Sequence, residues 1–186
     1  MSLASFALAS LLVLVTPGPT NTILAASGAA LGLRRAALLP AAEAIGYAVA
    51  ISAFLMAAEI LAGVPAAMSI VKGIAALWLF FSAVRLWSRP VVPDMPAQGS
   101  AFMTVLLTTM LNPKALLVGT ILIPGMLPDR PAIGIAAFMT LSILAGLGWT
   151  ALGALLPPAA RRYSYKGAAL VIAGFGIAAA VSAVSA

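Results

Sequence analysis

Hydrophobic residues dominate six long stretches of the chain, and short breaks rich in charged residues, glycine or proline separate them. Each stretch is rich in Ala and Leu and lacks the strict alternation of a strand in a membrane barrel. About 20 apolar residues in a helix cross the hydrocarbon core of a bilayer. The pattern therefore predicts six transmembrane helices, at residues 2–30, 37–60, 65–87, 100–127, 132–155 and 166–185.

A proline-rich segment, SRPVVPDMPAQG at residues 88–99, is the linker-like part of the chain. Its prolines could not hold a helix. It divides the sequence into two halves of three predicted helices each, residues 1–87 and 100–186. We therefore expect an all-α, polytopic membrane protein with a single transmembrane domain over residues 1–186.

The two halves contain related sequences at matching depth. LLVLVTPGPTN at 11–21 resembles LTTMLNPKALL at 107–117, at an offset of 96 residues. Each central proline lies about 13–15 residues, or ~20 Å, into the first helix of its half. Because three helices per half start the second half from the opposite side, we predict an inverted repeat of three plus three helices. Its first and fourth helices should be broken near the midplane, where such transporters bind substrate.

Two prolines should open the first predicted helix. Pro17 and Pro19 lack a backbone N–H and clash with the preceding turn, while Gly18 removes side-chain bulk between them. Pro19 is a plausible first residue of a restarted helix, whose free N–H groups would favour a carboxylate. A kink that serves packing alone is the alternative. We favour a substrate site that comprises Thr16, Pro17, Gly18, Pro19, Thr20 and Asn21.

The second break should lie at Asn112, Pro113 and Lys114. A lysine at a helix centre costs about 2.5–3.5 kcal/mol on insertion scales, and from this depth it cannot fully reach water. Lys114 should therefore face the interior and contact freed carbonyls, Glu43 or a bound anion. A lysine that only ties down carbonyls is the alternative. We favour a role for all three residues in binding substrate.

Glu43 is a second charged residue within a predicted helix that is a candidate for a role in transport. It lies about six residues into the second helix, ~9 Å from the membrane boundary. It either pairs with Lys114, carries a coupling proton, or is an interfacial acid that reaches headgroup water. It is our candidate for proton coupling.

Composition supports lipid as the solvent and excludes several chemistries. Of 186 residues, 63% are hydrophobic and 8% are charged, which is too little charge to cover a water-facing surface. The absence of Cys and His, with only four carboxylates, argues against thiol chemistry, metal sites and a resident cofactor. Without His a serine hydrolase would need a Ser–Lys dyad, and no serine motif accompanies Lys114, so we expect no enzyme. Scattered basic residues and few aromatics argue against nucleic-acid binding.

The distribution of Lys and Arg predicts the orientation. The second and fourth connections carry only Arg130, or two basic residues if Lys72 is counted. Since basic residues favour cytoplasmic loops, the odd connections should be cytoplasmic and both termini outside. The odd connections carry seven: Arg34, Arg35, Arg85, Arg89, Arg161, Arg162 and Lys166.

Small residues recur within several predicted helices and suit close helix packing or contact with a second copy of the chain. A homodimer is therefore a candidate assembly. The positions are Gly28, Gly32, Gly146, Gly148, Gly153, Gly174 and Gly176.

The motifs resemble those of the LysE/RhtB family, the LysE-type translocators, over nearly the whole chain. TPGP at 16–19 matches one family motif, NPKA at 112–115 matches another, and Pro124 resembles the proline that follows. The chain departs from the family pattern where Thr20 intervenes before Asn21.

This resemblance implies an exporter of amino acids or related small metabolites in the bacterial inner membrane, with a small-molecule substrate and proton antiport. An exporter of another small solute or of a cation, as in the wider LysE superfamily, is the alternative.

Overall fold

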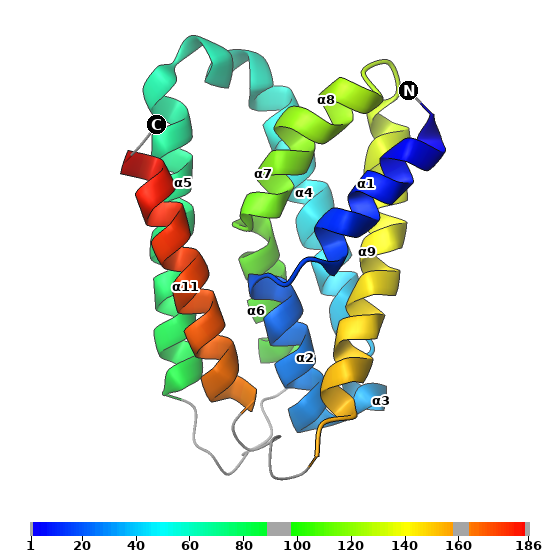
Figure 1. Cartoon of the computed structure of the whole chain (residues 1–186), viewed down its shortest axis with the longest axis vertical. Coiled ribbons are helices and arrows are strands. Elements are labelled where there is room, and N and C mark those ends of the chain that lie inside the picture. Colours follow the sequence, from blue (N-terminus) through cyan, green and yellow to red (C-terminus); the bar gives the residue numbers. More distant parts are fainter. Residues whose placement is uncertain (1, 89–97, 158–163, 185–186) are drawn as a thin grey trace.

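The computed structural model describes residues 2–88, 98–157 and 164–184, and within these ranges every regular element is a helix (Figure 1). The all-α prediction is confirmed for this part of the chain. Two described helices are long and apolar enough to cross a membrane, Leu33–Ala57 and Pro131–Ala154, and two bent helix pairs raise the number to four if each is one span. These lengths and compositions are compatible with a membrane protein.

The first bent pair is formed by α1 (Leu3–Val15) and α2 (Pro19–Leu31), whose axes differ by 62°. Ser2 caps α1, since its side chain accepts a hydrogen bond from the backbone of Ser5. Pro19 occupies the first turn of α2, where a missing N–H costs nothing. The predicted break is confirmed, and it is short because α2 starts at the second proline of the motif.

The second bent pair joins α6 (Gln98–Met110) to α7 (Pro113–Leu117) with a bend of 46°. The chain continues through a π-helical segment, η1 (Val118–Leu122), into the short α8 (Ile123–Met126). The break at 111–112 was predicted, whereas the π-helical segment was not. Figure 1 shows both breaks in the middle of the helical bundle.

Two long helices hold the broken pairs together. The first is α4 (Leu39–Gly63), preceded by the single-turn α3 (Leu33–Ala36), and the second is α9 (Pro131–Ala154). Helix α9 packs against α2.

Glycines bring α2 and α9 into close contact. A Cβ at Gly153 would overlap the carbonyl of Ala25, and one at Gly28 would overlap that of Thr150. The predicted packing role is therefore confirmed for these two glycines. Gly32 instead ends α2 with a φ of 76°, a left-handed conformation that glycine adopts without strain.

Helices α5 (Pro65–Trp87) and α11 (Ser164–Val184) lie side by side at one edge of the bundle (Figure 1). The Lys166 ammonium donates to the carbonyl of Trp87 and lies 4.6 Å from the centre of its ring. Both described ends of the chain lie at the end of the bundle where α8 meets α9. Most of the predicted linker, and Arg161 and Arg162, fall outside the described residues; α6 already begins at Gln98.

Apolar side chains form two separate cores, one on each side of the helix breaks. One includes Leu24, Leu39, Leu79, Val105 and Ile172. The other includes Phe6, Leu14, Tyr47, Val118 and Phe138.

Candidate functional site

The two helix breaks meet through Lys114. Its ammonium donates a hydrogen bond to the carbonyl of Thr16, which the first break leaves without a helical partner. The aliphatic part of the side chain lies on Gly18, where an added Cβ would be 3.0 Å from Cε. Lys114 and Gly18 are also counterparts at the offset of 96 residues that relates the two halves. Equivalent residues are expected to touch where a two-fold axis passes between them.

Asn21 satisfies the carbonyls at the end of α1. Its side-chain amide donates to the carbonyl of Leu14 at 2.7 Å and to that of Thr16 at 3.1 Å. The side chain is 2% exposed, so it acts away from water. The carbonyl of Thr16 thus receives donors from both halves of the chain, an amide and an ammonium.

A directed chain of hydrogen bonds joins the two breaks on their buried side. Asn112 donates to the hydroxyl of Thr20 at 3.0 Å, and the Thr20 and Thr109 hydroxyls lie 3.2 Å apart. Because the Thr109 hydroxyl donates to the carbonyl of Val105 at 2.8 Å, the proton between the two threonines belongs to Thr20. The side-chain oxygen of Asn112 accepts a hydrogen bond from the backbone N–H of Lys114 at 3.0 Å and so caps α7.

The predicted site residues fall into two groups by exposure. Thr16 and Pro17 are exposed, and Lys114 is half-buried. The Thr16 hydroxyl donates to the carbonyl of Leu12 in its own helix. The group that Thr16 offers to the site is therefore its backbone carbonyl. Nothing is described of the Pro113 side chain. The buried members brace the site and are Gly18, Pro19, Thr20, Asn21 and Asn112.

Glu43 is buried in the first turns of α4 and is 1% exposed. This burial argues against the interfacial alternative, in which the carboxylate reaches headgroup water. Its Oε2 faces the bare backbone of Gly146 on α9, where a Cβ would lie 2.6 Å away. Within the described residues that oxygen makes no hydrogen bond. The Lys114 ammonium interacts with this carboxyl electrostatically.

These groups favour a ligand that carries a carboxylate. Helix α2 has 13 residues, and the N–H groups of Thr20 and Asn21 lie in its first turn, where no helical carbonyl can accept from them. A helix N-terminus and a nearby ammonium both stabilise an anion. The negative charge of the buried Glu43 carboxyl would attract an amine. The arrangement is therefore suited to a small zwitterion.

Sequence reasoning missed Thr109, Tyr47 and the contact at Gly146. Thr109 precedes the second break by a single turn, and Tyr47 lies four residues after Glu43 on the same helix face, so both spacings held a signal. Gly146 was predicted to suit close helix packing, but the sequence did not reveal that Glu43 lies against it, because this contact depends on the approach of α9 to α4. No protein-family model, curated protein or solved structure matches the chain.

Proposed function

We propose that the chain is a bacterial inner-membrane exporter of amino acids or related small metabolites, similar to the LysE/RhtB family, which works by alternating access and proton antiport. The observation that carries the proposal is the contact between Lys114 of one helix break and the Thr16 carbonyl of the other. A charged residue at this depth is costly, so a role in transport explains its presence better than packing does.

The proposed architecture has six spans in an inverted repeat. Each half begins with a broken helix, α1–α2 or α6–α8, and two further helices follow it. The contact between Lys114 and its counterpart Gly18 supports a two-fold relation between the halves. The excess of basic residues in the odd connections supports both termini outside. A second copy of the chain could pack at Gly174, beside which an added Cβ would meet no other atom within 4 Å.

In the proposed cycle the substrate competes with the protein for Lys114. Without substrate, the Lys114 ammonium ties the second half to the Thr16 carbonyl of the first. A substrate carboxylate at the start of α2 would take over the ammonium, because a charged acceptor binds it more strongly than a carbonyl does. The substrate would then link the two halves in place of the direct hydrogen bond between Lys114 and Thr16. Movement of one half against the other would expose the substrate to the opposite side.

Glu43 is proposed to carry the coupling proton. Its carboxyl interacts electrostatically with Lys114 and is buried away from water. Burial suits a group that must keep its proton during a conformational change. A proton on Glu43 would remove the negative charge that attracts the amine of a bound zwitterion. Proton uptake would then favour substrate release.

Growth resistance tests the proposal. Overexpression in a bacterial host should protect it from toxic concentrations of at least one amino acid or amino-acid analogue, and Lys114→Ala should abolish this protection. Gly148→Ala is the matched control, since its position is open and lies away from the site. Protection that survives Lys114→Ala would contradict the site. Protection from metal salts alone would favour the cation exporter instead.

A further inference from the structure

In the described part of the chain, five buried side-chain polar atoms make no hydrogen bond. Three of them lie along one seam of the bundle: Glu43 Oε2, the Tyr47 hydroxyl and the Ser10 hydroxyl. Their residues are at most 1% exposed. An unsatisfied buried polar group costs about 1–3 kcal/mol. Three of them in one place therefore call for a functional explanation.

Glu43 and Tyr47 lie on the same face of α4, four residues apart. This face follows α9, because Glu43 Oε2 lies against Gly146 and the Tyr47 ring packs edge-on against Phe138, with centroids 5.1 Å apart. Between those contacts, on the same face of α9, lies the fully buried Ser142. The seam between α4 and α9 is thus lined with polar groups over two turns.

Ser10 approaches this seam from α1. It shares a helix face with Phe6 and Leu14, which belong to the same apolar core as Tyr47 and Phe138. Helices α1 and α9 start together and run the same way (Figure 1). At 1.5 Å per residue, Ser10 lies about 10 Å below Leu3, and Phe138 lies about 8 Å below Ile133. Ser10 therefore lies in the same part of the bundle as the contact between Tyr47 and Phe138.

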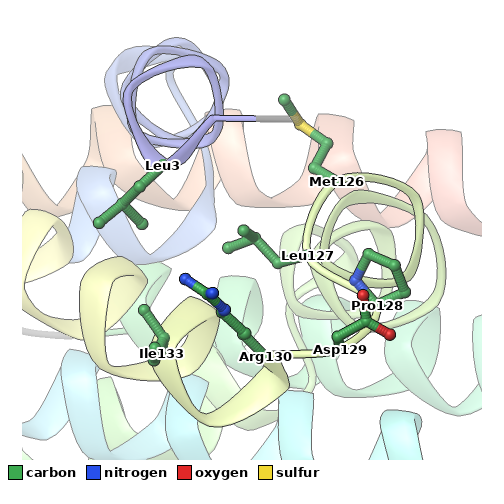
Figure 2. Close-up of a pocket in the computed structure, with 7 residues that line it drawn as sticks. All are labelled: Leu3, Met126, Leu127, Pro128, Asp129, Arg130 and Ile133. Atoms are coloured by element: carbon green, nitrogen blue, oxygen red, sulfur yellow. The ribbon is translucent and has the colours of Figure 1, made fainter.

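A pocket of about 390 Å³ opens at the end of this seam where the chain termini lie. Leu3 at the start of α1 and Ile133 at the start of α9 line it, and the Arg130 side chain extends into the space between them (Figure 2). Two fully buried rings, Phe6 and Phe138, lie along the two helices between the pocket and the unpaired hydroxyls.

We propose that the seam between α1, α4 and α9 is a gated proton path, which runs from the Arg130 pocket through Ser10 and Tyr47 to Glu43, with Phe6 and Phe138 as its plug. The path rests on the proposed exporter function and gives its proton a route separate from the substrate site.

Each step along the path conserves atoms and charge. When the plug opens, water joins the hydroxyls. Each hydroxyl accepts a proton from the outer side and passes its own inward, until the Glu43 carboxylate receives one. Among the described residues, the ionisable group that acts on Glu43 is Lys114 from α7, and Glu43 in turn acts on Tyr47 of its own helix. Asp129 and Arg130 are the charged groups at the pocket.

Proton entry into proteoliposomes tests this path without any substrate. The full chain is reconstituted in vesicles that contain a pH-sensitive dye, and a potassium diffusion potential drives protons inward. Wild type should leak little, and Phe6→Ala should raise the proton flux about tenfold, because the space it opens borders polar atoms and the pocket. Phe138→Leu reduces the plug on α9 instead of α1, and it replaces Phe6→Ala in this test if that variant does not fold.

Second substitutions then locate the path. Glu43→Gln or Tyr47→Phe, added to either plug variant, should return the flux to the wild-type level. Ser10→Ala, added to a plug variant, should lower the flux. Its matched control is Ser5→Ala, on the exposed face of α1, which should leave the flux raised. Tyr47→Phe should not lower the thermal stability, because it removes an unpaired hydroxyl. A flux that both substitutions at Glu43 and Tyr47 leave unchanged, or no flux from either plug variant, would overturn the path.

Exchange of labelled amino acid across the same vesicles, with no pH gradient, tests the exporter function separately. Wild-type exchange together with a plug flux that depends on Glu43 supports both proposals. Absence of exchange for every amino acid, with the same plug flux, would contradict the exporter and still support the proton path.

Discussion

Gly18→Ala is a minimal perturbation of the candidate site. Gly18 has φ −162° and ψ 174°, an extended conformation that any residue adopts, so alanine introduces no backbone strain. The new Cβ would lie 3.0 Å from Cε and 3.1 Å from Nζ of Lys114. Because carbon atoms pack best at about 3.5–4.0 Å, the lysine must move. The substitution therefore acts on the position of Lys114 rather than on the fold.

The expected size follows from the hydrogen bond that the Lys114 ammonium is proposed to make to the substrate carboxylate. A hydrogen bond to a charged group contributes about 1.5–3 kcal/mol. Since a flexible lysine can recover part of it, we expect the lower end, which corresponds to about a tenfold fall in transport rate. The assay is uptake of a labelled amino acid into everted membrane vesicles with matched protein levels.

A double-mutant cycle separates this mechanism from general damage. Gly18→Ala should have no further effect in a Lys114→Ala background, because the atoms that it displaces are gone. Gly148→Ala, at an open helical position, should leave transport unchanged and can raise stability slightly. An equal loss from Gly18→Ala with and without the lysine would refute the reasoning.

Three further substitutions test the packing around the site. Asn21→Leu should lower the free energy of unfolding by about 1–3 kcal/mol in a detergent–denaturant titration, because the Leu14 carbonyl loses its side-chain donor while the Thr16 carbonyl keeps Lys114. Gly153→Ala should lower the melting temperature, because the new Cβ would overlap the backbone of Ala25, which cannot move away as a flexible side chain can. Asn112→Ala should cost about 1 kcal/mol from the lost cap, plus the bond to Thr20, measured by the same titration.

Each of these has a contradicting outcome. Stability unchanged in Asn21→Leu would mean that the carbonyls at the end of α1 do not depend on this amide. A melting temperature preserved in Gly153→Ala would show that α2 and α9 are farther apart than the structure has them. If Asn112→Ala cost no more than Asn112→Ser, which keeps a capping oxygen, the helix cap would contribute nothing.

The helix breaks could be predicted because proline acts locally. Pro19 and Pro113 fix where α2 and α7 start by their own covalent geometry, and no distant residue is needed. The inward position of Lys114 was predictable for a similar reason, because lipid leaves a charge at this depth few alternatives. What the pattern could not supply was which carbonyl the lysine bonds.

Features that depend on contacts between helices were not predictable from one sequence. The chain from Asn112 through Thr20 to Thr109 requires the register of α2 against α6. The burial of Glu43 requires the close approach of α9 at Gly146, which a count along α4 does not reveal. The π-helical segment likewise lies where Gly119 meets the backbone of α4, a contact far apart in sequence.

The most direct test of the central claim is exchange of a labelled amino acid in proteoliposomes that contain only the purified full chain. Wild type and Gly148→Ala should exchange external label against the same amino acid inside, and Lys114→Ala should reduce the exchange to the level of empty vesicles. Exchange at the wild-type rate in Lys114→Ala, or none by the wild type for any amino acid, would contradict export through the two helix breaks.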